Sequence, residues 1–205
     1  MLYGFDVFCS CHLDELGEVS FINLKRNVTR LGLEIIFDKI ILKKLFDIMY
    51  EEPDMNVNYF IEISKKTLYS ENFFNWLEER MILLKKSKLF LKVDIDTYEK
   101  LIEILRYSKN SQIDFSLIDF DNNLVDGSVI KDYDINLVEI NASLFADIER
   151  NNEVIDFIIY FCRKYNKTII VSAISTSNQF QSIKDYNIDY YINNFRSNDH
   201  EDINR

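Results

Sequence analysis

Polar side chains recur where apolar, strand-like segments of this 205-residue chain end. These residues are Asp6, Glu62, Ser64, Lys92, Asp94, Asp119, Glu139, Asn141, Ser172 and Ser175. Carboxylates that converge from several strand ends could bind a hard divalent cation, which takes oxygen ligands. Two features argue against such a site: Lys92 would bring a positive charge to it, and most segments supply only one acid. A solvated rim of polar residues explains the same pattern, so Asp119 is either a metal ligand or what is left of one.

The segments that carry these residues alternate between strand and helix patterns. Short runs rich in β-branched and aromatic residues predict seven strands, at 3–8, 56–63, 88–95, 112–119, 135–141, 168–174 and 188–192. Apolar residues at helical spacing predict helices at 34–52, 70–86, 97–109, 151–165 and 175–186. Ser70 is the expected N-cap of the second of these helices, because a hydroxyl can accept a hydrogen bond from the first turn.

Strand–helix alternation of this kind requires a parallel sheet covered by helices. We expect a (β/α) barrel of the TIM-barrel type that forms one domain over residues 1–195, followed by a polar tail at 196–205. An open, doubly wound sheet is the alternative, because periodicity does not separate the two. In a barrel the chemistry lies where the strands end, at the carboxyl face.

Charge and cysteine content limit the kinds of partner. The formal net charge of −10 argues against a nucleic acid or an anionic membrane surface as the partner, since both require a basic face. Cys9, Cys11 and Cys162 form no disulfide framework, which suits a reducing compartment. The run Cys9-Ser10-Cys11-His12 has no second Cys and His cluster to complete a zinc site. Without a signal peptide or a spanning segment in the sequence, we expect a cytoplasmic protein.

The segments "GFDVF" at 4–8, "FIEIS" at 60–64 and "LKVDI" at 91–95 follow one another along the chain with the later polar strand ends. Their order resembles that of the EAL domain, a bacterial phosphodiesterase family that opens cyclic di-GMP. "GFDVF" at 4–8 stands where the family has Glu-Ala-Leu, so Asp6 takes the place of the Glu. "FIEIS" at 60–64 is similar to the Asn-x-Ser strand, with Glu62 at the Asn, and "LKVDI" at 91–95 to Glu-x-Thr-Glu, with Lys92 and Ile95 at its acids. The resemblance runs through nearly the whole chain, although no single motif is intact.

Three later segments continue the resemblance. "LIDFD" at 117–121 is similar to Asp-Asp-Phe-Gly, with Ile118 at the first Asp and Asp119 at the second. "VEINASLF" at 138–145 resembles the Lys-Ile-Asp strand, with Glu139 at the Lys and Asn141 at the Asp. "VSAIST" at 171–176 looks like Ala-Glu-Gly-Val-Glu-Thr, with Ser172 and Ser175 at the two acids.

The resemblance implies a dismantled catalytic site. Family members are understood to use two divalent metals, held by carboxylates, to attack a phosphodiester. Lys92 would place a positive charge among these ligands, while Ile118, Asn141 and Ser172 remove negative ones. We therefore expect no metal, no cofactor and no catalysis, with Asp119 as a remnant. Ser10 stands where the family has an Arg that resembles a phosphate clamp, so we do not expect cyclic di-GMP to bind.

A retained scaffold with a dismantled site is typical of a protein-interaction domain. The chain starts at the family's signature and ends early, so a first strand and a closing helix are expected to be missing. Apolar surface left by that gap could serve a protein partner or a homodimer through an outer helical face. We expect this face on residues 34–51 (with Phe37 and Phe46) and 72–84 (with Phe73, Phe74 and Trp76). A cyclic di-GMP receptor without hydrolysis is the alternative, and an active phosphodiesterase with unusual ligands is a third.

Overall fold

The computed structural model describes residues 4–9, 11–13, 17–51, 56–82, 84, 86–105, 112–118 and 135–193. The chain forms two compact units, which divide in sequence between Ser116 and Leu117. None of the helices in these described ranges has the length and apolar character that crossing a membrane requires.

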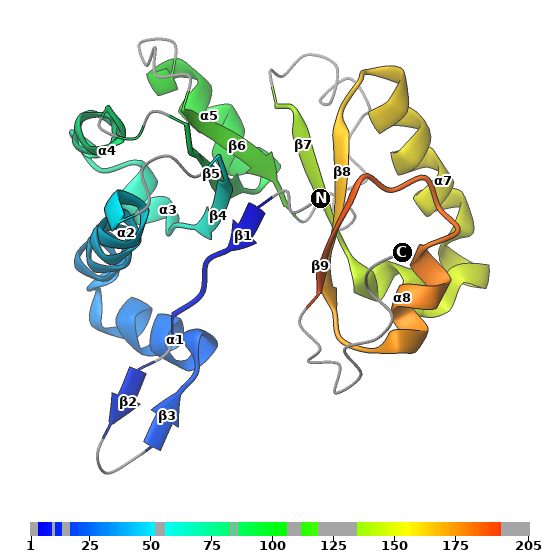
Figure 1. Cartoon of the computed structure of the whole chain (residues 1–205), viewed down its shortest axis with the longest axis horizontal. Helices are drawn as coiled ribbons and strands as arrows, with labels where there is room; N and C mark the ends of the chain where they lie inside the picture. Colours follow the sequence, from blue (N-terminus) through cyan, green and yellow to red (C-terminus); the bar gives the residue numbers. More distant parts are fainter. Residues whose placement is uncertain are drawn as a thin grey trace. The chain divides into compact units, whose positions relative to one another are not determined.

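The first unit is built on a sheet whose strands lie in the order β1-β4-β5-β6. Their bounds are β1 Gly4–Asp6, β4 Asn58–Glu62, β5 Lys88–Val93 and β6 Ile113–Leu117, and β1, β4 and β5 pair in parallel. The helices of this sheet are α2 (Glu34–Glu51), α3 (Lys65–Leu68), α4 (Phe73–Met81) and α5 (Ile95–Leu105). Figure 1 shows α2, α3 and α4 along one side of β4 and β5. Buried side chains from both layers form the core between them: Leu42, Leu45, Phe46, Ile61, Leu77, Met81, Leu89 and Leu91.

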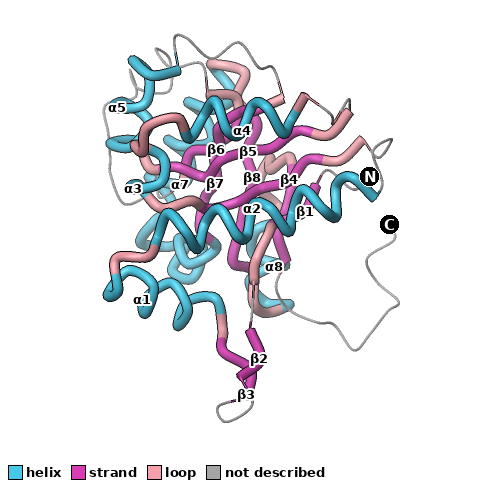
Figure 2. The backbone as a smooth tube through the Cα atoms, turned by 90° about the vertical axis from the view of Figure 1, so that its left-hand side faces the viewer, coloured by secondary structure: helices cyan, strands magenta, loops and turns pink. Residues whose placement is uncertain are grey.

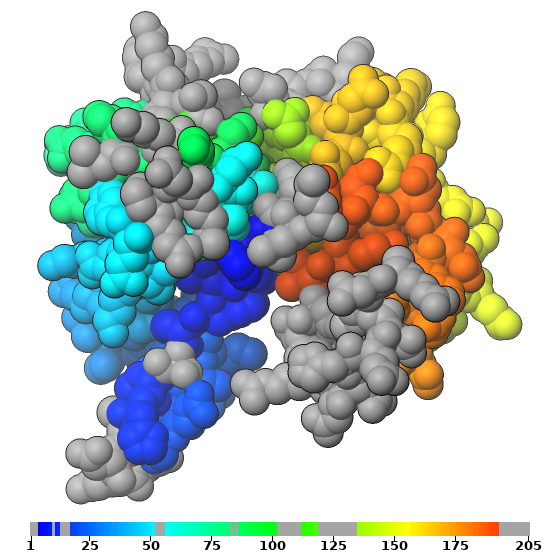
Figure 3. Space-filling view, viewed as in Figure 1, coloured from blue at the N-terminus to red at the C-terminus, as the bar shows by residue number. Residues whose placement is uncertain are grey.

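A small antiparallel hairpin and a helix precede α2. Strand β2 (Cys11–Leu13) pairs with β3 (Gly17–Val19), and α1 (Phe21–Leu31) follows. Helix α1 contains no fully buried residue, and its C-cap Gly32 adopts φ 70°, a left-handed conformation that glycine takes without strain. In the space-filling view the hairpin, in dark blue, protrudes from the first unit beside α1 (Figure 3).

The second unit has parallel strands in the order β7-β8-β9. Strands β7 (Leu137–Asn141), β8 (Thr168–Ile174) and β9 (Tyr190–Asn193) alternate with η1 (Ala142–Asp147), α7 (Ile148–Lys164) and α8 (Ser177–Ile183). The amphipathic helix α7 packs Ile155, Ile158 and Cys162 into the core of this unit. The Arg163 guanidinium donates hydrogen bonds to both carboxylate oxygens of Asp189 at 2.9 and 2.8 Å. This contact holds the residue before β9 against the last turn of α7.

All seven predicted strands are present, but two local predictions are wrong. Helix α4 starts after Asn72, which adopts φ 62°, and Ser70 instead donates its hydroxyl to the Thr67 carbonyl. Phe46, Phe73 and Phe74 do not belong to an exposed face. They are buried because they fill the layer between the helices and the sheet, so any exposed apolar surface on these helices is formed by other residues.

Candidate functional site

The carboxyl ends of β1, β4 and β5 carry the polar residues of the first unit. Asp6 pairs in register with Phe60, Phe60 with Phe90, and Glu62 with Lys92. Side chains in register on parallel strands point to the same face of the sheet. The rings of Phe60 and Phe90 stack on this face at 4.8 Å between centroids, and both are buried. Asp6, Glu62 and Lys92 therefore lie above an aromatic floor.

Lys92 and Asp6 form a buried ion pair on this face. The Lys92 Nζ lies 2.8 Å from Oδ1 and 2.9 Å from Oδ2 of Asp6, and the two side chains are only 7% and 9% exposed. Since β4 lies between β1 and β5, the lysine side chain reaches across a whole strand to its partner. A charge out of water is stable only when it is compensated by close, well-placed partners. The ammonium therefore binds both oxygens of the carboxylate that stands at the signature position.

Glu62 is directed to a different partner. Its Oε1 accepts a hydrogen bond from Lys25 of α1 at 2.6 Å, and the Glu62 side chain is 49% exposed. The Lys25 ammonium also lies 5.1 Å from the centre of the Phe21 ring, a cation–π distance. This contact ties the end of β4 to α1.

Asp94, the residue after β5, caps a helix. Asp94 accepts a hydrogen bond from the Thr97 amide at 2.8 Å at the start of α5, and its carboxylate lies 2.7 Å from the Lys65 ammonium. Partial burial raises the pKa of Asp94, but the hydrogen bonds from Lys65 and Thr97 outweigh it and hold the pKa below its usual value. A carboxylate at a helix N-terminus is the expected cap. Asp94 is therefore engaged in local structure.

The carboxylate of Asp38, on α2, binds residues that follow the end of β4. It is buried, and its Oδ2 accepts hydrogen bonds from the amide and hydroxyl of Ser64 at 3.0 and 2.6 Å and from the Thr67 hydroxyl at 2.6 Å. Ser64 is in turn the N-cap of α3. Sequence reasoning missed this network, although an acid on the same helical face as Leu42 and Leu45 is a signal for it.

In the second unit, Asn141 ends β7, Glu139 lies in the middle of that strand, and Ser172 lies two residues before the end of β8. Asn141 pairs in register with Ser172, and its Oδ1 accepts a hydrogen bond from the Ser143 amide at 2.9 Å, which caps η1. Ser172 and Glu139 are buried. Neutral side chains thus occupy two positions where the family resemblance places acids.

Strand β8 ends in an irregularity that also involves a motif residue. Ala173, at the place of the motif's Gly, adopts φ 59°, and the pairing of β8 with β9 shifts register between Val171 and Ile174. Two residues on, the amide and hydroxyl of Ser175 both donate to Oε1 of Gln179 at 2.9 Å. Ser175 is thus part of the turn into α8.

Asp119 and Ser10 lie outside the described residues, and the predictions on them stay predictions. Ile118 is described and half-buried, and it carries no ligand atom.

The residues that the structure describes do not fit the divalent metals that the family implies. Among the described residues, no three His, Cys, Asp or Glu side chains come together closely enough to hold a metal ion. The Asp6 carboxylate already has a cation, the Lys92 ammonium, on both of its oxygens. Mg²⁺ would have to displace this ammonium and lose water for few carboxylates in return.

Comparison with known proteins identifies the fold. The model of the EAL domain family matches residues 1–192. No curated protein sequence matches the chain. Among solved structures, the FimX EAL domain from Pseudomonas aeruginosa bound to c-di-GMP has a TM-score of 0.75 at 13% identity, over 91% of this chain and 79% of that chain. The EAL domain protein from Listeria monocytogenes EGD-e has a TM-score of 0.74 at 14% identity, over 93% and 79% of the two chains. The FimX EAL domain from Xanthomonas citri in complex with c-diGMP has a TM-score of 0.77 at 10% identity, over the same shares.

These likenesses show an α/β fold of the TIM-barrel-like EAL type. The barrel prediction is confirmed, and the open doubly wound sheet is wrong. Since the family model spans nearly the whole chain, the chain belongs to the EAL domain family.

Proposed function

We propose that this chain is a non-catalytic EAL domain that acts in cyclic di-GMP-related signalling by binding another protein. The observation that supports it is the buried ion pair of Lys92 and Asp6. Hydrolysis in the family depends on metals held by converging carboxylates. A lysine in that place compensates a carboxylate without supplying a Lewis acid or activating a water molecule.

The charge balance of the site supports the same conclusion. Two unit charges 4 Å apart interact by about 4 kcal/mol at an effective dielectric of about 20. The Lys92 ammonium would repel a divalent cation at this distance with about twice this energy, because the ion carries two charges. Asn141 and Ser172 contribute no charge to offset it, since they stand as neutral side chains at former acid positions.

Cyclic di-GMP binding without hydrolysis is the second candidate. It is supported by the solved relatives, because the titles of both FimX EAL structures name bound c-di-GMP. The residues of this chain favour it less. The Lys92 ammonium is already paired with Asp6, and Glu139 brings a buried carboxylate to the place of the family's lysine, where it would face an anionic ligand.

Turnover and binding assays on the purified chain separate these functions. We expect no conversion of cyclic di-GMP to its linear form in Mg²⁺ or Mn²⁺, and no saturable heat on titration with the dinucleotide at low micromolar concentration. Saturable binding without turnover would establish the receptor. Turnover that survives purification and disappears in Asp119→Ala would reject the proposal, whereas Asp94→Ala is the control for loss of an acid outside the site.

A further inference from the structure

Exposed aliphatic side chains gather at the turn between α1 and α2. Leu31, Leu33, Ile36 and Ile40 are 64%, 44%, 59% and 51% exposed, and we name these four residues the α1–α2 patch. Leu33, the residue before α2, and Ile36 and Ile40 on α2 follow one another at spacings of three and four, so they form one stripe on one side of the helix. Single exposed leucines are ordinary, but a contiguous group of this kind marks an interface.

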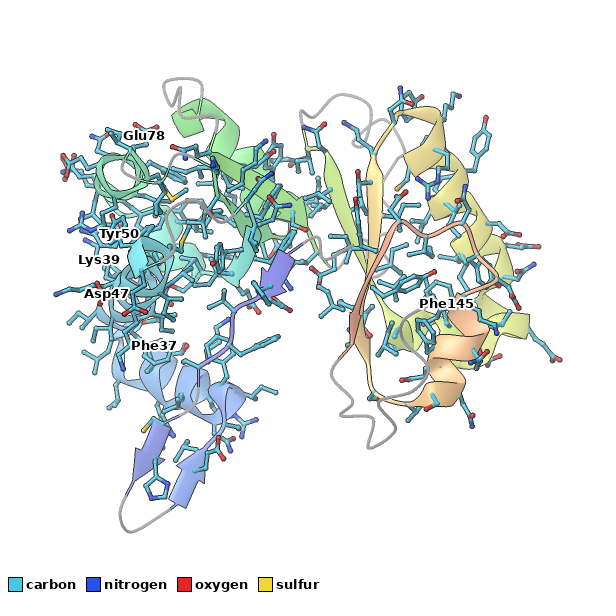
Figure 4. All side chains as sticks on the ribbon, in the orientation of Figure 1. Phe37, Lys39, Asp47, Tyr50, Glu78 and Phe145 are labelled. Atoms are coloured by element: carbon cyan, nitrogen blue, oxygen red, sulfur yellow. The ribbon has the colours of Figure 1, made fainter. Side chains whose placement is uncertain are left out.

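The stripe lies opposite the side of α2 that packs into the core. Leu42, Leu45, Phe46 and Met49 are the buried apolar residues of this helix. Figure 2 shows α1 and α2 side by side, and the rings of Phe21 and Phe37 join them at 6.5 Å between centroids. Figure 4 labels Phe37, Lys39 and Asp47 among the side chains of α2. The patch thus lies on the exposed side of α2 and its turn from α1, whereas the opposite side of α2 packs into the core.

Exposed basic residues flank the α1–α2 patch in the sequence of both helices. Arg26 and Arg30 on α1 and Lys43 and Lys44 on α2 are exposed. Residues 21–44 contain six Lys and Arg and two acids, a net charge of +4, so the remaining residues of this −10 chain carry −14. Both of these acids are engaged, since Glu34 lies 3.3 Å from the Lys66 ammonium and Asp38 is buried in its hydrogen-bond network. Of the basic residues, Lys25 is paired with Glu62, and the exposed acid Asp47 follows Lys43 by one turn of α2. A locally positive, apolar surface therefore stands on an acidic protein.

We propose that the α1–α2 patch binds an acidic amphipathic helix of a partner protein. This inference rests on the proposed function and names its binding surface. Leucine-like anchors of the partner contact the patch, and its carboxylates contact Arg30, Lys43 and Lys44. Leu33 to Ile40 spans about 10 Å along the helix, the reach of two turns, which suits anchors at positions i, i+3 or i+4, and i+7.

Charge complementarity favours this occupant over two others. A second copy of the chain would bring its own basic patch into a two-fold contact, so that like charges would face one another. An anionic bilayer would attract the patch but repel the other residues, which carry −14. An acidic amphipathic helix is complementary to both the apolar stripe and the basic residues beside it.

A peptide-display selection against the purified chain tests the inference. The probe is a library of random peptides of about 16 residues, enough for four helical turns. We expect the enriched peptides to carry apolar residues at helical spacing and an excess of Asp and Glu. Their affinity should fall at least about tenfold in Ile36→Ser/Ile40→Ser and in Lys43→Glu/Lys44→Glu, because anchors and desolvated charges dominate such interfaces. Circular dichroism of the variants should be unchanged, since all four side chains are exposed.

Matched controls decide between the outcomes. Ile82→Ser removes an equally exposed isoleucine, and Arg150→Glu/Lys184→Glu reverses two charges in the second unit; both should bind the peptides like the unmodified chain. Enriched peptides that are neutral or basic, no enrichment at all, or a dimer that Ile36→Ser/Ile40→Ser dissociates would overturn the inference. Co-sedimentation with vesicles of phosphatidylcholine and phosphatidylserine that depends on the patch would overturn it in favour of a membrane. Peptides that bind equally well to all variants would show that the binding surface lies outside the α1–α2 patch. This result would overturn the inference but not the proposed function.

Discussion

The Lys92 ammonium lies 2.8 Å from Oδ1 of Asp6, although 86 residues separate the two in the chain. One strand, β4, lies between them, so the contact exists only when β1, β4 and β5 are assembled in parallel. This ion pair joins the position of the family's signature acid to a position where a second acid is expected. It is therefore the contact through which the proposed lack of catalysis can be tested most directly.

The first prediction concerns the stability of this pair. Lys92→Met should lower the free energy of unfolding by roughly 3 to 5 kcal/mol, because it leaves the Asp6 carboxylate buried without its cation. Asp6→Leu/Lys92→Met should recover most of this loss, since two apolar side chains can replace a buried pair. Urea unfolding followed by circular dichroism measures both, with the exposed Lys88→Met as the control on the same strand. Additive losses in the double variant would show that the two residues are not coupled.

The second prediction reverses the charge at Lys92. Lys92→Glu should be less stable than the unmodified chain, because two carboxylates would then face each other above the Phe60 ring. Millimolar Mn²⁺ should raise the melting temperature of this variant and leave that of the unmodified chain unchanged, since divalent cations bind where carboxylates converge. Lys92→Gln, which has no charge, serves as the comparison. An equal response of all three proteins to Mn²⁺ would contradict the argument that Lys92 excludes the metal.

The third prediction concerns Ala173. A residue with a Cβ loses about 1–2 kcal/mol in the left-handed conformation, whereas glycine loses about 0.5–1 kcal/mol more backbone entropy on folding. At φ 59° the first effect is the larger, so Ala173→Gly should stabilise the chain by roughly 0.5–1 kcal/mol. Ala142→Gly, at a buried position without a positive φ, should destabilise it. Thermal unfolding of the two variants decides the sign of each effect.

The fourth prediction is a pH dependence. Hydrogen bonds from Lys65 and Thr97 hold the pKa of Asp94 below its usual value, despite partial burial. A carboxyl whose pKa is lower in the folded state contributes stability above its unfolded pKa, near ~3.9, and loses it as the pH falls through the folded value. The difference in unfolding free energy between the unmodified chain and Asp94→Asn should therefore be constant near neutral pH and shrink below about pH 4. A difference that stays constant into this acidic range would show that Asp94 does not contribute to the pH dependence of stability.

Strands were easier to predict from the sequence than the small elements between them. Buried parallel strands such as β8, with Ile169, Ile170 and Val171 in succession, contain apolar runs that are recognisable without a partner. Strands β2 and β3 have three residues each and no such run. Helix α1 contains Asn23, Asn27 and Thr29, which are weak helix formers, and buries no residue completely.

The sequence names candidate site residues, but it does not predict the contacts that the described ones make. The position of Lys92 among the expected ligands follows from the order of the motifs. Its pairing with Asp6 depends on strand order and register, which no local pattern encodes. The capping roles of Asn141 and Asp94 are local, and a sequence reading directed at metal ligands passed over them.

A cation that is covalently attached to β5 cannot be exchanged, diluted or removed by a chelator. The Asp6 carboxylate therefore receives its counter-charge at the moment when β1, β4 and β5 assemble, independently of the supply of magnesium in the surroundings. A carboxylate that depends on a bound metal is compensated only while that ion is available, whereas Asp6 is compensated from folding onward. On this face of the sheet the ion pair is a permanent part of the architecture.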